Sequence, residues 1–460
     1  MIDTRKKIGT AAAVVSLCAA VGVVGLIGCA PQAATPAAST GGPDAPAATT
    51  ETGADTEAAS YDGGNLDKWA EQFPLQYNSY HQSPVKADGK HHGHYDLKAK
   101  LFAPVVRDGS ALITTEADGT TDTNGDGTYQ ISGFEYDESI GKWVIDESEL
   151  GQVKAQTFKM GCYSCKSGTF DQVLEQRGPE IFTQEVDQEF MDTMNGQIWA
   201  CNICHGDMPG TKPTSTFTYF NTVGRDGLDE FSDNEKACGQ CHNSLDYRHA
   251  ITDNEVFNKF SAYRYGTDVD SLIKAVNEDD ITVMDEEIGT KLVVFDHDEI
   301  EFAHTSPMAE LGVDCVTCHM PESTENGQTY TNHHASGSPL ENPDSLAKCL
   351  ECHESQGIKT ADEMVKMVRD KQADATATHD AVKAKLDQAH ELLAAKTAAG
   401  TPDAELADVR AKYQTADGYL QHIRGGNNGS GTKVVHNVPQ FYDLAAKADR
   451  LCDEMIAELS

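Results

Sequence analysis

Positive charge and apolar side chains are both scarce in this chain. Lys and Arg number 36 against 73 Asp and Glu, so the formal net charge is −37 over 460 residues. We therefore exclude nucleic acids and anionic membrane surfaces as partners. A site for an anion would need its own local positive charge. Hydrophobic residues make up only 39% of the sequence, which leaves a sparse side-chain core for a chain of this length.

Long apolar runs are absent beyond the N-terminus, so the sequence predicts no later membrane-spanning segment. The N-terminus has a basic stretch at residues 5–7 and an apolar run at residues 8–27, typical of an export signal. The run leads to Cys29 in a sequence that resembles a bacterial lipobox. Residues 1–29 would then be a lipoprotein signal peptide, with Cys29 lipidated. The alternative is an uncleaved membrane anchor. Both place the body outside the cytoplasm, attached to the cell membrane on its periplasmic or outer face.

Large apolar side chains are also missing from residues 30–60, where Ala, Thr, Pro and Gly dominate. Such a composition predicts a disordered tether. A flexible chain of about 30 residues has an r.m.s. reach of roughly 30 Å. The tether would allow the body to dock on a partner in the same membrane.

Cysteine, by contrast, is abundant and patterned. The 13 Cys include five C-x-x-C pairs, where roughly 0.4 would be expected by chance. In four pairs a His follows directly, as in c-type haem attachment, where both Cys bind the porphyrin and the next residue ligates iron. Zinc knuckles do not need that repeated His. We therefore expect five covalently bound haem c groups, which would supply the missing apolar core. The motifs are Cys162-Tyr-Ser-Cys165-Lys166, Cys201-Asn-Ile-Cys204-His205, Cys238-Gly-Gln-Cys241-His242, Cys315-Val-Thr-Cys318-His319 and Cys349-Leu-Glu-Cys352-His353.

The first motif differs from the others because Lys166 stands where His normally ligates the iron. The distance from this motif to the next resembles the later spacings, which favours a real haem site over a degenerate, haem-free motif. An amine must be deprotonated to ligate, and the iron would drive that loss. A haem with a different proximal ligand indicates a different role. We expect four haems to carry electrons and this one to do chemistry.

The body is expected at residues 61–355, with a β-rich insertion at residues 108–157. In the insertion, Gly, Asp and Thr separate short alternating runs, which predicts a small β-hairpin. Residues 122–127 resemble the start of a calcium loop. The twelfth position is Gly133 rather than a carboxylate, so a plain turn is the better interpretation.

The C-terminal region, residues 356–460, has helical periodicity. We expect one helix over residues 361–398, a second over residues 403–423, and a third from near Pro439 to Glu458. Cys452 in the third helix is expected to be a buried small apolar residue. The fold class is therefore mainly α: a multihaem cytochrome c with a haem-packed core, long C-terminal helices and a small β-hairpin insertion.

One C-x-x-C-K motif, four C-x-x-C-H motifs and long C-terminal helices resemble the ammonia-forming cytochrome c nitrite reductases, the pentahaem cytochrome c-552 family. The resemblance runs from about Gly93 to the C-terminus and is most specific over residues 315–339. It implies an open iron position opposite Lys166, where nitrite is reduced to ammonia with six electrons in anaerobic respiration. It also implies a membrane quinol-oxidising multihaem cytochrome as electron donor, and a homodimer.

The resemblance also assigns distal haem ligands. The family has a His seven residues before the fourth motif, where this chain has Met308. Either Met308 or His304 would therefore ligate the fifth haem. The remaining distal ligands would be His333 (alternatively His334) for the second haem, His94 for the third and His436 for the fourth.

Three residues would surround the open position, again by resemblance. Arg107 lies one position from the family's Arg and would stabilise an anion. His297 matches the family's His by its spacing to the fourth motif and would deliver protons. Tyr247 adjoins the family's Tyr position and would hydrogen-bond intermediates. The alternatives are an exposed loop His for His297 and a packing aromatic for Tyr247.

Departures from the family concern calcium and the substrate. The family often has a calcium site beside the pocket, but Ser244, Val294 and Asp296 stand at its ligand positions. The calcium site is therefore expected to be lost or rebuilt. Two alternatives follow: the same fold reduces another small oxidised compound (hydroxylamine, sulfite or an organic acceptor), or the chain is a non-catalytic electron-transfer lipoprotein.

Overall fold

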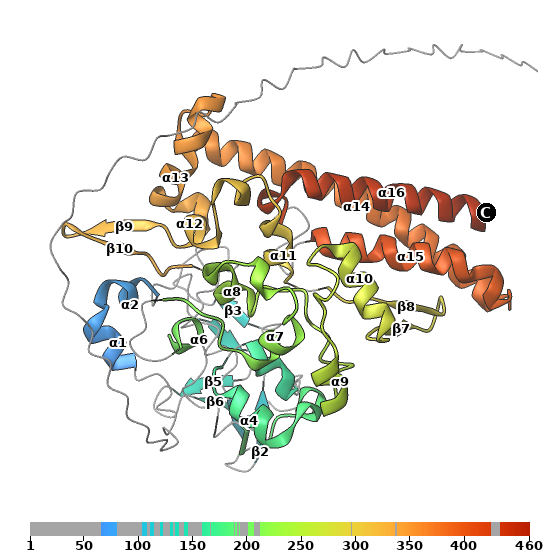
Figure 1. The fold of residues 1–460 in the computed structure, drawn as a ribbon, viewed down its shortest axis with the longest axis horizontal. Coiled ribbons are helices and arrows are strands. Elements are labelled where there is room, and N and C mark those ends of the chain that lie inside the picture. The colour runs from blue at the N-terminus through green and yellow to red at the C-terminus, as the bar shows by residue number, and fades with distance from the viewer. Residues whose placement is uncertain are drawn as a thin grey trace, which may run out of the picture. The chain divides into compact units, whose positions relative to one another are not determined.

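The computed structural model describes most of the chain from residue 159 onward and parts of what precedes it (Figure 1). Cys29, His94 and Lys166 lie outside the described residues, as do all of residues 1–60. The described parts are residues 66–80, six strands between residues 104 and 145, and residues 159–460 without 166, 188, 191–192, 194–200, 207–211, 296, 336–337 and 425–432.

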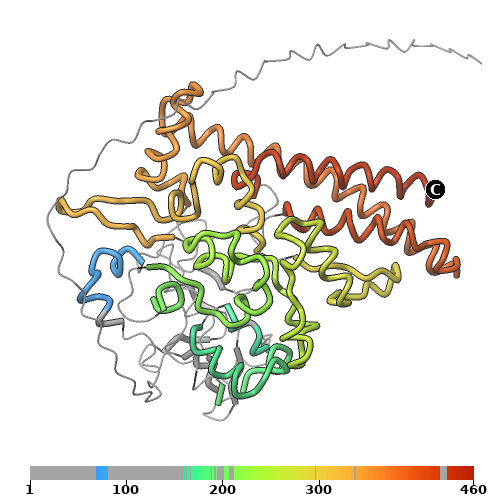
Figure 2. The backbone as a smooth tube through the Cα atoms, in the orientation of Figure 1, coloured from blue at the N-terminus to red at the C-terminus, as the bar shows by residue number. Residues whose placement is uncertain are grey.

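Three long helices form the C-terminal region and confirm the periodicity of the sequence. They are α14 (Ala361–Ala398), α15 (Asp403–Arg424) and α16 (Val438–Leu459). Figure 2 shows them in orange to red, running alongside one another. A capping box at Thr360 starts α14. Gly400, at φ 78°, turns the chain after α14, and Cys452 is fully buried as expected.

The β-rich insertion is more elaborate than a hairpin. Its main sheet has the order β2-β1-β6-β5, in which β1 and β6 are parallel and the other pairs antiparallel. The sheet already begins at Pro104, before the expected insertion. The strands are β1 (Pro104–Arg107), β2 (Ala111–Thr114), β5 (Phe134–Asp137) and β6 (Lys142–Ile145), with a separate hairpin of β3 (Thr120–Asp122) and β4 (Tyr129–Ile131).

Short helices carry the five C-x-x-C motifs, and each of these helices ends within its motif. The first motif lies on the 3-10 helix η2 (Met160–Cys165), and the third begins in the last turn of α8 (Asp233–Gly239). The others lie on α6 (Asn202–His205), α12 (Cys315–His319) and α13 (Pro343–His353).

The remaining body elements are short helices and two hairpins. The helices are α1 (Leu66–Gln72), α2 (Pro74–Tyr80), α4 (Phe170–Arg177), η3 (Pro179–Thr183), α7 (Thr218–Val223), η4 (Leu228–Glu230), α9 (Asn254–Lys259), α10 (Val269–Glu278), α11 (Glu299–His304), η5 (Ala309–Leu311), η6 (Pro339–Glu341), η7 (Glu354–Gln356) and η9 (Lys433–His436). The hairpins are β7 (Val283–Asp285) with β8 (Thr290–Leu292), and β9 (Glu322–Glu325) with β10 (Gln328–Thr331).

Two glycines beside motifs allow close packing. A Cβ at Gly161 would overlap the backbone of Phe182 on η3, and a Cβ at Gly239 would overlap Ile300 on α11. The first and third motifs are thereby fixed against neighbouring segments. The fold is mainly α, and no helix in the described part combines the length and apolar character needed to cross a bilayer.

Candidate functional site

A pocket of about 130 Å³ lies where the first and third motifs meet. The Sγ atom of Cys241 is 3.0 Å from the carbonyl oxygen of Cys165, so the two attachment loops are in contact. His297, the predicted proton donor, lies at this pocket. The pocket is lined by Cys165, Tyr219, Cys241, Asn243, Leu245, Asp246, Arg248 and His297.

Arg248 supplies positive charge at the pocket. Its Nη1 donates to the carbonyl oxygen of Gly161 (2.7 Å) and to Oγ of Ser164 (2.9 Å), both in the first-motif loop. Its Nε donates to Oδ1 of Asp246 (2.7 Å). Burial alone would lower the pKa of Arg248, but contact with Asp246 raises it above the usual range. Sequence reasoning missed this residue, because nothing local signals that it crosses to a loop more than 80 residues away.

Arg107 is described by its backbone alone. Its backbone ends β1 and pairs with Ala111, whereas its side chain lies outside the described residues. The backbone of Cys162 belongs to η2, and its side chain is likewise not described. The place of Arg107 beside the first haem therefore stays a prediction.

Two tyrosines lie near the pocket, and Tyr219 on α7 is the one that lines it. Its hydroxyl bonds to the carbonyl oxygen of Leu245 and accepts from the backbone N–H of Tyr247 at 3.2 Å. Tyr247 is fully buried, with its ring edge on Phe260 at 5.4 Å. The Tyr247 hydroxyl has no hydrogen-bond partner among the described residues. Tyr219 therefore presents the phenol nearest the pocket, which the sequence did not indicate.

His297 lies between the pocket and the third motif. Its ring centroid is 5.8 Å from that of His242, and its Nδ1 is 4.0 Å from Oε2 of Glu299. The backbone of His297 has a φ of 52°, a left-handed conformation that turns the chain just before α11. This turn places the imidazole next to both motifs.

Histidine rings lie opposite one another in two places in the body. The centroids of His205 and His333 are 6.0 Å apart, and those of His319 and His436 are 6.3 Å apart at an interplanar angle of 8°. Metal–nitrogen bonds of about 2 Å on each side would place two imidazole centroids roughly 6 Å apart. Both pairs therefore fit a single iron between the rings, as haem requires.

Burial keeps these imidazoles neutral. It lowers the pKa of His319 to about 4, with help from His436, and lowers the pKa of His333 to about 4. A neutral ring is the form that binds iron. The structure thus brings together the partners that the sequence predicted for the second and fourth motifs.

The N-terminal helices brace the second-motif pair. The Trp69 ring on α1 lies 5.5 Å from His205, and the backbone N–H of His333 donates to Oγ of Ser79 on α2 at 2.9 Å. The Nδ1 of His333 is 2.8 Å from the carbonyl oxygen of Thr331, which leaves Nε2 to bind a metal. Figure 1 shows α2 beside β10, the strand that leads to His333, with α1 packed on α2.

The two candidates for the fifth haem differ in their surroundings. The Nδ1 of His304 is 3.3 Å from Oε1 of Glu235, and its ring lies 4.8 Å from Phe231. This contact leaves Nε2 of His304 available, the usual arrangement for a ligating His. Met308 is half-buried at the start of η5. The contact with Glu235 therefore favours His304.

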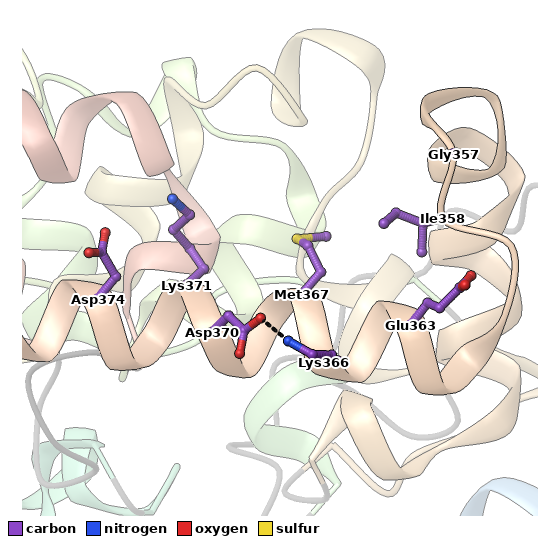
Figure 3. A pocket seen from close by; sticks show the side chains of 8 residues that line it. All are labelled: Gly357, Ile358, Glu363, Lys366, Met367, Asp370, Lys371 and Asp374. Carbon is purple, nitrogen blue, oxygen red and sulfur yellow. Dashed lines mark hydrogen bonds and ion pairs between the residues drawn. The ribbon is translucent and has the colours of Figure 1, made fainter. Parts of the chain in front are cut away.

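A surface groove of about 480 Å³ adjoins the fifth motif along the first turns of α14 (Figure 3). Ile358 and Met367 provide its apolar part, while an ion pair joins Lys366 to Asp370. The backbone N–H of Ile358 donates to the carbonyl oxygen of His353 at 3.2 Å. The fifth motif therefore lies close to this surface.

Ser244, at one of the family's calcium positions, has a protein partner instead. Its N–H and hydroxyl both donate to Oε1 of Glu301, at 2.9 and 2.7 Å. Tyr263 donates to the same oxygen. Burial raises the pKa of Glu301 to about 7. Asp296 lies outside the described residues.

The mainly helical fold, the five attachment motifs and the facing imidazole pairs define a multihaem c-type cytochrome. The family model "Cytochrome c552" matches residues 141–452, and the chain belongs to this family.

Similar proteins agree with that assignment at low identity. The cytochrome c-552 of Aliarcobacter butzleri is 26% identical over 212 residues, covering 42% of this chain and 40% of that protein. The cytochrome c-552 of Bacteroides thetaiotaomicron is 23% identical over 319 residues, covering 65% and 59%. The matches thus span less than two thirds of these relatives' length.

A solved structure shows the same fold. It is the catalytic subunit of cytochrome c nitrite reductase from Desulfovibrio desulfuricans, described with two calcium sites. The TM-score is 0.59 at 16% sequence identity, and the alignment covers 88% of this chain and 87% of the other.

Proposed function

We propose that this protein is a pentahaem cytochrome that reduces nitrite to ammonia at the first motif. The observation that carries the proposal is the pocket beside Cys165, lined by His297, Arg248 and Tyr219. It joins an attachment motif with a lysine in place of histidine to a cation, an imidazole and a phenol. A purely electron-carrying haem site has no need of such a pocket.

The ten cysteines of the five motifs would hold the haems covalently, with Lys166, His205, His242, His319 and His353 as proximal ligands. His333 and His436 would complete the second and fourth sites, since they face His205 and His319. His94 is proposed for the third site. His304 is preferred to Met308 for the fifth, because of its contact with Glu235.

The bound haem at the first motif would supply electrons and an open iron position. Nitrite, six electrons and eight protons give ammonium and two waters. The positive field of Arg248 would favour nitrite in a chain of charge −37, and Arg107 would add to it. His297 would hand protons into the pocket. Tyr219, rather than Tyr247, lines the pocket and would border the bound substrate there, with its hydroxyl held by Leu245 and by the backbone of Tyr247.

The cellular setting is also proposed. Cys29 would carry a lipid, residues 30–60 would tether the body outside the cytoplasm, and a membrane quinol-oxidising multihaem cytochrome would donate electrons. The long C-terminal helices would form a homodimer. The protein would serve anaerobic respiration.

The direct test is a steady-state assay of the haem-loaded protein with reduced methyl viologen. We expect nitrite-dependent oxidation of the dye and one ammonium formed per nitrite. Full haem loading with no nitrite-dependent oxidation would contradict the proposal. Turnover with hydroxylamine, sulfite or an organic acceptor in its place would identify a different reductase of the same fold.

A further inference from the structure

The carboxylate of Glu299 lies near two imidazoles, that of His242 in the third motif and that of His297 at the pocket. We propose that Glu299 is a positioning residue whose carboxylate holds His242 through Nδ1 and thereby lowers the reduction potential of the third-motif haem. The inference rests on the proposed haem attachment at Cys238 and Cys241.

The contact is direct. Oε2 of Glu299 lies 3.1 Å from Nδ1 of His242. A carboxylate only accepts, so Nδ1 carries the proton and Nε2 is left to face the iron. The same Glu299 oxygen lies 4.0 Å from Nδ1 of His297 at the pocket. Among the described residues, His242, His297 and Glu299 form a group whose ligand atoms all lie within 4.8 Å of one another.

Packing fixes the position of Glu299. It is the first residue of α11, and the N–H of the next residue, Ile300, donates to the carbonyl oxygen of His242 at 3.2 Å. Ile300 also fills the space that a side chain at Gly239 would need. The helix start and the third motif therefore hold each other in register, and the carboxylate has little freedom to move away from the imidazole.

The neighbouring carboxylate faces a different partner. Asp298 is 2% exposed and bonds to the amino group of Lys433 and to Nδ1 of His422, which are also buried. Asp298 is thereby neutralised inside the core. Glu299 instead faces His242, since its Oε2 lies 3.1 Å from Nδ1 of that ring.

An anionic acceptor on Nδ1 makes an imidazole a stronger electron donor to the metal on Nε2. Stronger donation stabilises the oxidised iron and lowers the reduction potential, since hydrogen bonding around axial ligands is one of the protein's controls over haem. The third motif touches the first through Cys241 and Cys165. A low-potential haem there would be a strong electron donor to the pocket.

The test is an EPR-monitored redox titration of the full-length, haem-loaded protein, because EPR separates individual low-spin haems. In Glu299→Gln we expect five haems by pyridine haemochrome and an upward shift in the potential of one low-spin haem. The exposed Glu287→Gln variant, the same chemical change on the β7–β8 hairpin, serves as the control and should leave every potential in place. Unchanged potentials in a fully loaded Glu299→Gln protein would overturn the inference.

If Glu299→Gln does not retain haem, a second variant tests the same inference. Glu299→Asp keeps the charge but shortens the side chain, so we expect assembly with a smaller upward shift of the same haem. Assembly with no shift would also overturn the inference. A wild-type haem count below five, or no nitrite turnover, counts against the proposed function instead, because the role of Glu299 is judged on the potential alone.

Discussion

At the residue scale, the pocket combines the ion pair of Arg248 and Asp246 with one imidazole, that of His297. Arg248 is held by Asp246 and by the first-motif loop, so its charge stays beside Cys165. His297 is placed by a left-handed backbone turn. Arg248 is therefore positioned by contacts between segments far apart in the sequence, and His297 by its local backbone conformation.

Arg248→Gln should weaken nitrite reduction, because the variant removes the positive charge and leaves Asp246 without its partner. We expect the KM for nitrite to rise by about tenfold, equivalent to ~1.4 kcal/mol, with a smaller change for neutral hydroxylamine. Arg248→Lys should recover part of the loss, since it keeps the charge without the planar fork. The exposed Arg369→Gln variant is the control. If Arg248→Gln with full haem content has the same nitrite kinetics as the wild type, Arg248 does not help to bind nitrite.

The two tyrosines should respond differently to loss of their hydroxyls. Tyr219→Phe removes a group bonded to Leu245 and Tyr247, so nitrite turnover should fall. Tyr247→Phe removes a buried hydroxyl without a partner among the described residues. It should leave turnover within about twofold and stability unchanged or raised by up to ~1 kcal/mol. Steady-state kinetics measures the turnover of each variant, and thermal unfolding measures its stability. A larger loss of turnover in Tyr247→Phe than in Tyr219→Phe would instead identify Tyr247 as the pocket tyrosine.

At the scale of elements, a buried charge cluster joins the start of α11 to η9 and α15. Lys433 and His422 both contact Asp298, and the amino group of Lys433 also donates to the carbonyl oxygen of His422 at 2.5 Å. Lys433 precedes His436 by one turn of η9. The cluster therefore ties the His297 loop to the segment carrying the predicted ligand of the fourth haem.

Lys433→Met should destabilise the protein by about 3–5 kcal/mol at neutral pH, because it leaves the buried Asp298 carboxylate with only His422 as a partner, and burial lowers the pKa of His422. Contact with Lys433 and His422 outweighs burial and lowers the pKa of Asp298. The wild type therefore loses this contribution only as the pH falls below about 4. In the variant, Asp298 protonates more readily, so the gap in stability should narrow toward acid pH.

Thermal unfolding followed by circular dichroism across pH 3–8 measures that gap. Lys366→Met breaks the exposed ion pair with Asp370 and should cost less than about 1 kcal/mol. The pairing of Lys433 with Asp298 would be contradicted if both variants lost the same stability relative to the wild type. It would also be contradicted if the loss in Lys433→Met grew toward acid pH.

The elements differed in how far the sequence predicted them. Helices α14, α15 and α16 followed from apolar periodicity and from the break around Gly400, which are local signals. The parallel pairing of β1 with β6 did not, because strand partners are chosen by contacts between distant segments. Likewise, resemblance to the family led to His333 and His436, whereas Arg248 and Tyr219 reach the pocket only through tertiary packing.

At the scale of the whole molecule, the motifs form neighbouring sites within one body. The first and third motifs touch through Cys165 and Cys241, and Ser345 on α13 bonds to the carbonyl oxygen of Cys318 in the fourth motif at 2.7 Å. Haems attached at touching motifs would lie close enough for electrons to pass between them. Haems bound in this way would supply the core of a chain with little apolar side-chain content.

Lys166→His would turn the first motif into an ordinary one. We expect the variant to retain five haems by pyridine haemochrome and to lose at least about tenfold in nitrite turnover, equivalent to ~1.4 kcal/mol, because the site would resemble the electron-carrying ones. The control is His353→Lys, which places lysine at a motif without the pocket and should create no second site of turnover. Unchanged turnover in Lys166→His would count against a special role for the lysine.

The central claim is that one haem of this protein, at the first motif, is open to substrate. It is tested most directly by adding nitrite, and separately cyanide, to the oxidised, haem-loaded protein and recording the EPR spectrum. We predict a high-spin signal from about one haem per chain that disappears as the ligand binds. A spectrum that is low-spin throughout, and unchanged by either ligand, would contradict it.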